Sequence, residues 1–409
     1  SDVYKRQKFY RSVIMNLKQL FVFLLLVCMG SANLTLRASG IEFNHGSWAE
    51  IVSKAKAENK LIFIDFYTQW CGPCLNMAQT VFSQPEVGEF YNKNFVNAKI
   101  DAENGEGREL AKKYQVRAYP SYIFVDPATE EAVHRSSSRQ SVEQFITTGK
   151  NAMTPTRRSF YLFDEYQKGN RSRELLKDYI DYNSSVYQSR AVVTAFDELI
   201  AGGAKLTEPD IWDLYNRTIS GMDNKYIKEV SDNYSQFCTL FGKEQVDAKL
   251  FKETTYGDLA AFDAMCDFKG KSFNRTFILI NQALNQQKYE EAAAQIDAVI
   301  ADSTVDQQQV IERLKFIARI NPYSASRMPE FWFNKCVEYL QYIAYNQTDR
   351  DDPFIHQSYA AALEEVLRRQ TDKSHIPAGV LSTPKYGKKT YSMRPDALKP
   401  KPKAKPKTK

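Results

Sequence analysis

The stretch that decides the fold is residues 61–75, LIFIDFYTQWCGPCL. Its first six residues are apolar except for Asp65, and such a run is typical of a central strand that is covered on both faces. Pro73, two residues after the first cysteine, suits the first turn of a helix. The stretch therefore predicts a buried strand that passes through a short turn into a helix, with Cys71 at the helix N-terminus.

The spacing of the two cysteines in this stretch suits redox chemistry. The helix dipole and free backbone N–H groups stabilise a Cys71 thiolate, and Cys74 is close enough to attack a mixed disulfide held by Cys71. A structural disulfide across two residues closes almost no loop and would stabilise little. A zinc site would need a second CxxC or a pair of histidines, and the sequence has neither. We expect Cys71 as nucleophile and Cys74 as resolving thiol, with no metal and no cofactor besides this pair.

Together with its surroundings, the WCGPC motif resembles the thioredoxin family over about residues 41–152. The resemblance implies that Asp65 is a buried acid that relays protons to Cys74, and the apolar run around it favours a raised pKa. It also implies that Pro120 is a cis-proline that faces the disulfide and docks the substrate. Three residues flanking the cysteines are assigned to the site by the same resemblance: Trp70, Gly72 and Pro73.

The order of expected elements agrees with this family, and we expect an α/β thioredoxin-like fold with a mixed sheet flanked by helices. The expected elements are a helix over 48–59, a strand from 61, the CxxC helix to 81, a turn at Pro85, a strand over 95–101, a helix over 107–114, strands over 121–125 and 132–135, and a closing helix from 141. This pattern is most similar to exported modules such as the terminal domain of the membrane thiol transporter DsbD. His45 and His134 are expected at the surface.

Three departures from the family lie around the expected docking rim. Leu75 follows the second cysteine, Tyr119 precedes the proline, and serines fill 136–138, where the family has a basic residue, a smaller residue and a glycine, respectively. They leave the sulfur chemistry intact and favour a restricted set of partners.

The second half of the chain, 158–370, is expected to be all helical, either a bundle or a degenerate repeat. Its apolar residues recur at three and four positions over 174–182, 186–199, 209–220, 225–241, 273–284, 289–301, 305–320, 329–345 and 356–369. Residues 285–292 are similar to the turn of a tetratricopeptide-like hairpin, but no strict 34-residue period is present. Trp212, Phe331 and Trp332 are expected in the core. We find no catalytic constellation here.

The first 32 residues have the composition of a secretory signal. Basic residues precede ten apolar ones at 20–29, which are fewer than the ~20 that a membrane span needs. Met15 is the better start, and cleavage is expected after Ala32. Lipidation at Cys28 and an uncleaved anchor remain as alternatives, and all three place the CxxC module outside the cytoplasm.

The C-terminal tail, 373–409, is expected to be disordered because it is rich in Lys and Pro. It carries eleven Lys or Arg and one Asp, a net charge of +10, whereas the whole chain has a net charge of +6. The rest of the chain therefore has a net charge of −4. Nucleic-acid binding by the folded part is therefore not indicated.

Besides Cys28 in the expected signal, three cysteines stand apart from the motif: Cys238, Cys266 and Cys336. Burial as small apolar residues is the favoured interpretation. One disulfide plus a free thiol stays open as the alternative.

These observations predict a periplasmic or otherwise extracytoplasmic thiol–disulfide oxidoreductase that reduces disulfides in substrate proteins. In an oxidising compartment it would need a membrane electron donor of the DsbD type. The alternative is an envelope binding or adaptor protein, whose helical half holds a protein client and whose thioredoxin fold serves mainly for docking.

Overall fold

The computed structural model describes residues 40–349 and 352–371. The expected signal (1–32, with Met15 and Cys28) and the basic tail (373–409) lie outside the described residues. The chain divides into two compact units between Ile219 and Ser220. Within the described ranges, none of the helices combines the length and hydrophobicity that a membrane span requires.

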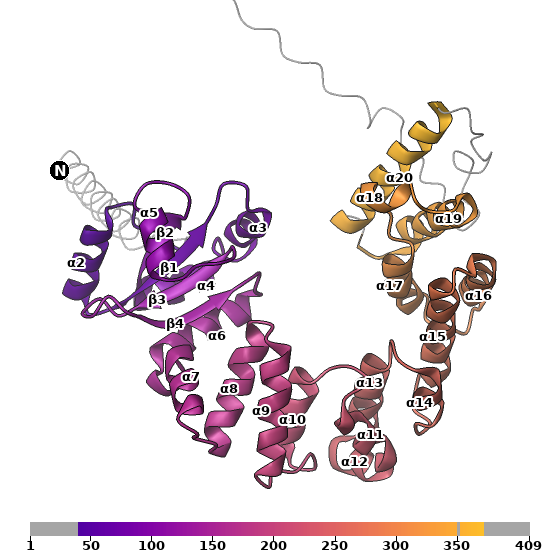
Figure 1. Ribbon diagram of the computed structural model, residues 1–409, viewed down its shortest axis with the longest axis horizontal. Helices are drawn as coiled ribbons and strands as arrows, with labels where there is room; N and C mark the ends of the chain where they lie inside the picture. The colour runs from indigo at the N-terminus through magenta and orange to yellow at the C-terminus, as the bar shows by residue number, and fades with distance from the viewer. Residues whose placement is uncertain (1–39, 350–351, 372–409) are drawn as a thin grey trace, which may run out of the picture. The chain divides into compact units, whose positions relative to one another are not determined.

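A four-stranded mixed sheet lies at the centre of the N-terminal unit (Figure 1). The strands are β1 (Leu61–Tyr67), β2 (Phe95–Asp101), β3 (Ser121–Val125) and β4 (Ala132–Ser137), in the order β2-β1-β3-β4. β1 is parallel to β2 and antiparallel to β3, and β3 is antiparallel to β4. The mixed sheet and the central place of β1 are confirmed.

Helices cover both faces of this sheet. One face is covered by α2 (Trp48–Glu58) and α5 (Gly107–Lys113), and the other by α3 (Gly72–Thr80), α4 (Pro85–Asn94) and α6 (Val142–Met153). Side chains alternate along β1, so Ile62 and Ile64 pack in the first cluster and Phe63 in the second. Asp65 therefore shares its face with Phe63, on the side of the CxxC helix α3.

Aromatic rings fill the core on the α3 side. Phe63 contacts Tyr91, Phe124 and Phe145, and the rings of Tyr91 and Phe145 stack at 4.4 Å. The buried Tyr91 hydroxyl is satisfied in this apolar core, because Oη donates a hydrogen bond of 2.7 Å to the Phe145 carbonyl oxygen.

After α6, the N-terminal unit continues with a 3₁₀ turn and four α-helices, and the first of these four helices was not predicted from the sequence. They are a 3₁₀ turn (Pro155–Arg157), α7 (Ser159–Gln167), α8 (Arg173–Ser185), α9 (Ser189–Ala201) and α10 (Pro209–Thr218). The unpredicted α7 packs on β4, which is the edge strand of the sheet. Trp212 of α10 is buried, as expected.

The surface position expected for His134 is wrong, because α7 covers it. His134 Nδ1 accepts a hydrogen bond of 2.9 Å from the Ser159 backbone N–H, and its ring lies 5.7 Å from that of Tyr182. Burial lowers the pKa of His134 to about 3, so the ring is neutral and acts as an acceptor. His45 is exposed, as predicted.

The C-terminal unit is helical in all its described elements, as predicted. These are α11 (Lys225–Asp232), α12 (Tyr234–Phe241), α13 (Lys243–Glu253), α14 (Leu259–Asp263), α15 (Lys271–Asn285), α16 (Tyr289–Ala301), α17 (Gln307–Ile317), α18 (Pro322–Ala325), α19 (Glu330–Asn346) and α20 (Pro353–Thr371). The helix expected over 225–241 breaks at Asn233 into α11 and α12.

The helix α13 was missed because two charged residues occupy its buried face. Lys249 and Glu253 are both buried and form an ion pair of 2.9 Å, so the apolar pattern expected for that face is interrupted. The core position expected for Phe331 is also wrong. Its side chain is 42% exposed, while its neighbour Trp332 is buried as predicted. Adjacent positions on a helix face different directions, so only one of the two reaches the core.

The three cysteines of the helical half are free thiols in the structure. Cys336 is buried, as favoured, whereas Cys238 and Cys266 are only half-buried.

Candidate active site

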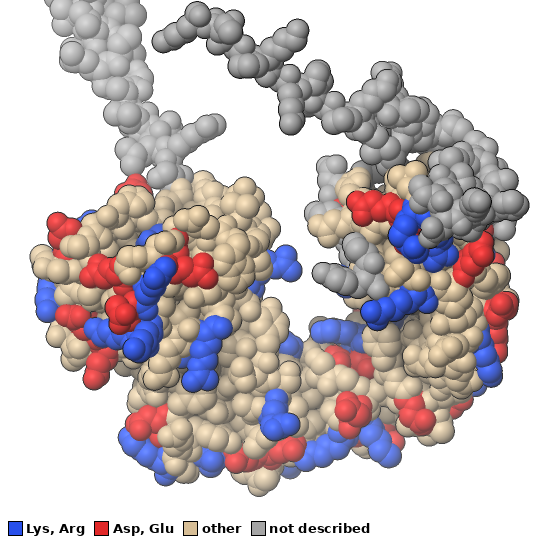
Figure 2. Space-filling model, turned by 45° about the horizontal axis from the view of Figure 1, so that its top comes forward, with Lys and Arg blue, Asp and Glu red and all other residues tan. Residues whose placement is uncertain are grey.

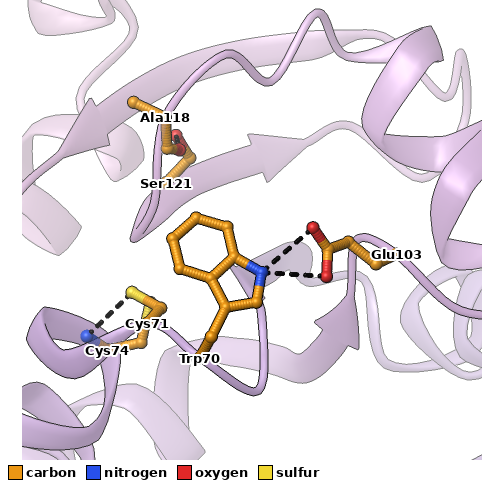
Figure 3. Close-up of a disulfide and its surroundings, with 6 residues drawn as sticks. All are labelled: Trp70, Cys71, Cys74, Glu103, Ala118 and Ser121. Atoms are coloured by element: carbon orange, nitrogen blue, oxygen red, sulfur yellow. Dashed lines mark hydrogen bonds between the residues drawn. A yellow bond between two sulfur atoms is a disulfide. The ribbon is translucent and has the colours of Figure 1, made fainter.

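Cys71 and Cys74 lie at the start of α3, where they form a disulfide (Figure 3). Cys71 is the N-cap residue, and its Sγ accepts a hydrogen bond of 3.1 Å from the Cys74 backbone N–H. Pro73 occupies the first turn of α3, where a backbone N–H has no partner within the helix, so the proline costs no hydrogen bond. When the disulfide is reduced, the same N-terminal N–H groups stabilise a thiolate at Cys71.

Asp65 lies on the central strand, and both of its carboxyl oxygens are buried without a hydrogen-bond partner among the described residues. Burial raises the pKa of Asp65 to about 7, while the positive charge of Lys99 opposes this rise. Cys74 and Met77 are the buried residues of α3, and Met77 packs in the cluster that contains Phe63. Asp65 thus shares a buried face with α3 and exchanges its proton near neutral pH, as a proton relay requires.

Trp70 presents an exposed apolar surface next to the disulfide. The side chain is 70% exposed, and its Nε1 donates to both carboxylate oxygens of Glu103 at 3.0 and 3.1 Å. Figure 3 shows the indole between the cysteines and Glu103, near the loop that carries Ala118 and Ser121. The Tyr119 ring of that loop lies 6.1 Å from the indole, nearly perpendicular to it. Together these contacts fix the orientation of an otherwise free side chain.

The loop before β3 brings the proline to this site. The Tyr119–Pro120 peptide bond is cis, and the Pro120 carbonyl oxygen accepts a hydrogen bond of 3.2 Å from the Ser138 N–H. Ser138 has φ +68°, a left-handed conformation that usually favours glycine. Gly72 faces open space, since a Cβ there would meet no atom within 4 Å.

Three neighbours of the site were not identified from the sequence: Lys99, Glu103 and Tyr122. Lys99 and Tyr122 flank Asp65 in register on β2 and β3, respectively. Neither pairing follows from the sequence alone, because the register between strands depends on how they pack in the sheet. Glu103 lies in the loop after β2, and the sequence carries no periodic signal for it.

Charges are mixed over the face in Figure 2, where Lys and Arg lie among Asp and Glu without one large patch of either sign. Among residues 40–349 and 352–371, no group of three or more His, Cys, Asp or Glu side chains is placed to hold a metal ion.

The region that contains the cysteine pair is similar to known proteins. Residues 44–127 match a family model described as thioredoxin-like. Thioredoxin-1 of Drosophila yakuba is 42% identical over 69 residues, which are 17% of this chain and 60% of that protein. Thiol:disulfide interchange protein DsbD 2 of Pseudomonas aeruginosa is 35% identical over 81 residues, 20% of this chain and 14% of that protein.

Among solved structures, a protein provisionally named a disulphide-isomerase, from Bacteroides thetaiotaomicron, is 38% identical. The match covers 29% of this chain and 96% of that one, with a TM-score of 0.27. All these matches cover less than a third of the chain, and the chain spans 60% and 14%, respectively, of the two curated relatives.

Proposed function

Because residues 44–127 form a thioredoxin-like domain, we propose that the protein is an exported thiol–disulfide oxidoreductase that reduces disulfides in other proteins. The observation that carries the proposal is the Cys71–Cys74 pair at the N-terminus of α3, on the sheet face that buries Asp65. The redox group is the cysteine pair itself, without a further cofactor.

In the proposed reaction, the Cys71 thiolate attacks one sulfur of a substrate disulfide, forms a mixed disulfide and releases the other substrate sulfur as a thiolate. Cys74 then gives its proton to the Asp65 carboxylate and attacks the Cys71 sulfur. The Cys71–Cys74 disulfide forms and the second substrate thiolate leaves. Two electrons pass from the dithiol to the substrate, which takes up two protons from Asp65 and solvent.

Trp70 and Pro120 are the proposed docking residues for the substrate chain. Trp70 is exposed and held by Glu103, and the cis peptide before Pro120 lies in the loop whose Tyr119 contacts the indole. Gly72 leaves the space above the cysteines open to an approaching chain.

Export and the source of electrons form the next part of the proposal. The basic and apolar composition of residues 1–32 supports a secretory signal, and the likeness to DsbD supports an extracytoplasmic module. A membrane donor of the DsbD type would then regenerate the dithiol after each turnover.

The test is the reduction potential of Cys71–Cys74, measured against a dithiothreitol or glutathione series on residues 33–409. A strongly reducing value, together with reduction of insulin disulfides that a Cys71→Ser variant lacks, is expected. An oxidising value would make the protein a disulfide donor and overturn the proposed direction.

A binding role is the second candidate, and exposed apolar side chains of the C-terminal unit favour it. Phe316, Phe331 and Leu367 all lie at the surface, where a protein client could cover them. If the protein serves as an adaptor, a Cys71→Ser strain will keep the phenotype of the wild type. If it is a reductase, that strain will match a deletion.

A further inference from the structure

The side chain opposite Asp65 on the neighbouring strand is Tyr122. The two residues are partners in the antiparallel register of β1 and β3, and partners in such a pair project to the same face of the sheet. That face is the α3 side, because the Tyr122 ring lies 6.2 Å from Phe63 and 5.2 Å from Phe145. The Tyr122 hydroxyl and the Asp65 carboxyl therefore share one buried region of the core.

Among the residues that the structure describes, neither group has a hydrogen-bond partner. Asp65 and Tyr122 are both buried, and the two carboxyl oxygens and the Tyr122 Oη are all without a bond to this part of the chain. Buried polar groups are paired in the large majority of cases, and each exception needs an explanation. Tyr91, a second buried tyrosine in the same core, follows the rule by donating to the Phe145 carbonyl oxygen. Packing alone does not account for a hydroxyl at position 122, because a phenylalanine would fill the same ring position.

We propose that Tyr122 is a positioning residue of the redox reaction, whose hydroxyl donates a hydrogen bond to the Asp65 carboxylate while Asp65 is charged. The inference rests on the proposed function, in which Asp65 must be ionised to accept the proton of Cys74. Because the two residues are directly opposite each other in the register, a rotation of the Asp65 side chain or one bridging solvent molecule would connect the two groups. A hydrogen bond to the charged form favours that form, and so keeps part of the Asp65 population ready to act as a base.

Tyr122 does not itself give up a proton in this step. Burial raises the pKa of its hydroxyl above the ordinary value, and the charge of Asp65 raises it further. It therefore remains a donor over the whole working range of pH.

Other groups that face Asp65 act differently. Lys99, in register on β2, attracts the carboxylate by its charge, and its Nζ lies over the rings of Phe43 and Tyr67. Tyr67 lies two residues along β1, and burial together with the charges of Asp101 and Asp65 raises its pKa. From α3, the buried residues are Cys74 and Met77, and Met77 packs in the same cluster as Phe63 and Tyr122. Among these groups, Tyr122 is the one that offers a buried hydroxyl without a bond in the protein.

The experiment compares Tyr122→Phe with Tyr91→Phe in the full chain. Each change removes one hydroxyl from the same aromatic core, so the two variants are matched in size and position. We measure the pH dependence of the single-turnover rate of insulin disulfide reduction from pH 5 to 9. We also measure the pKa of Asp65 by ¹³C NMR of the labelled carboxyl group, and the unfolding midpoint in guanidinium chloride.

Tyr122→Phe should move the acid limb of the rate profile, and the Asp65 pKa, upward by about one pH unit, or tenfold in proton affinity. At pH 5, where Asp65 is protonated, its unfolding midpoint should stay at or above the wild-type value, because the proposed hydrogen bond forms only to the charged carboxylate. Tyr91→Phe should lower the midpoint and leave the profile where it is in the wild type. In an Asp65→Asn background, Tyr122→Phe should have no further effect on the rate.

An Asp65 pKa that is the same in Tyr122→Phe and the wild type would overturn the inference. Tyr122→Leu, which also lacks the hydroxyl, replaces Tyr122→Phe if that variant fails to fold, and the same criterion applies. The NMR measurement does not depend on turnover. A wild-type protein without reductase activity would therefore refute the proposed function, while the Asp65 titration would still decide whether Tyr122 stabilises the carboxylate.

Discussion

Replacing Asp65 by Asn should stabilise the oxidised protein at alkaline pH and change its stability least in acid. Burial raises the pKa of Asp65 from 3.8 to about 7, so the folded protein holds a proton that the unfolded chain releases. Between these two values the unfolded state binds fewer protons than the folded state. The free energy of unfolding therefore falls as the pH rises, and it levels off above pH 7.

The size of the effect follows from the same two values. A difference of roughly three pKa units, at 1.36 kcal/mol for each, amounts to about 4 kcal/mol of lost stability above pH 7. Solvent does not screen the charge of Asp65, because the carboxyl group is buried. The neutral amide of Asn avoids the ionisation cost, so the variant should gain most of this amount at pH 8 and little of it at pH 4.

The assay is guanidinium chloride unfolding of both proteins from pH 4 to 8.5, followed by circular dichroism and tryptophan fluorescence. Asp101→Asn is the control, since that residue ends the neighbouring strand β2. Burial tends to raise the pKa of Asp101, but hydrogen bonds from the Glu103 N–H, Asn104 and Gln69 lower it overall. The effect of this carboxyl on stability therefore lies below its ordinary pKa of 3.8, and Asp101→Asn should keep the wild-type pH dependence between pH 4 and 8.5. A stability difference between wild type and Asp65→Asn that is the same at every pH would refute the reasoning.

Three further predictions follow from other parts of the structure. A Cys74→Ser variant should accumulate a mixed disulfide between Cys71 and its substrate, visible by mass spectrometry of non-reduced samples; absence of such adducts during turnover would contradict the proposed order of attack. His134→Gln should lose less stability than the wild type on acidification. Burial lowers the His134 pKa from 6.5 to about 3, so the free energy of unfolding of the wild type falls as the pH drops through that interval. Equal acid unfolding curves for the two proteins would argue against it. Lys249→Met should destabilise the chain by about 3 to 5 kcal/mol in urea unfolding, since it leaves the buried Glu253 charge without its cation. The double variant Lys249→Met/Glu253→Leu should recover much of that loss. If Lys249→Met is as stable as the wild type, breaking the pair carries no such penalty.

The sequence predicted the parts of the site that depend on local chain geometry. A carboxylate within an apolar run indicated a buried Asp65, and a proline after the first cysteine indicated a helix that starts there. Both follow from neighbouring residues, so they can be derived without knowing the rest of the fold. The structure agrees, with Asp65 buried and α3 beginning at Gly72.

The errors concern positions decided by distant residues. His134 has the polarity of a surface residue, and only the packing of α7 on β4 buries it. The helix α13 was missed because Lys249 and Glu253 neutralise each other inside the core, a pairing that the apolar pattern cannot reveal. Tyr122 became relevant once the register set it opposite Asp65.

The packing of α7 on β4 also limits how a protein substrate can approach the domain. An exposed edge strand offers free backbone groups to which another chain can add as a further strand. At β4 this route is obstructed, because the Arg135 N–H donates to Ser159 Oγ at 3.0 Å and His134 bonds the Ser159 N–H. At the opposite edge, Asn44 forms a bridge with Ala98 of β2.

With contacts at both edges, recognition should depend on the side chains around the disulfide rather than on strand addition. Trp70 and Leu75 are exposed there, at 70% and 59%, and Tyr119 packs against the indole. Leu75 stands where the thioredoxin family commonly carries a basic residue, so we expect this rim to favour apolar substrate segments. The selectivity of the protein for its substrates would then lie in the side chains of this rim, which contact the partner, and not in its sulfur chemistry. Changing these side chains should alter substrate preference and leave the Cys71–Cys74 reduction potential unchanged.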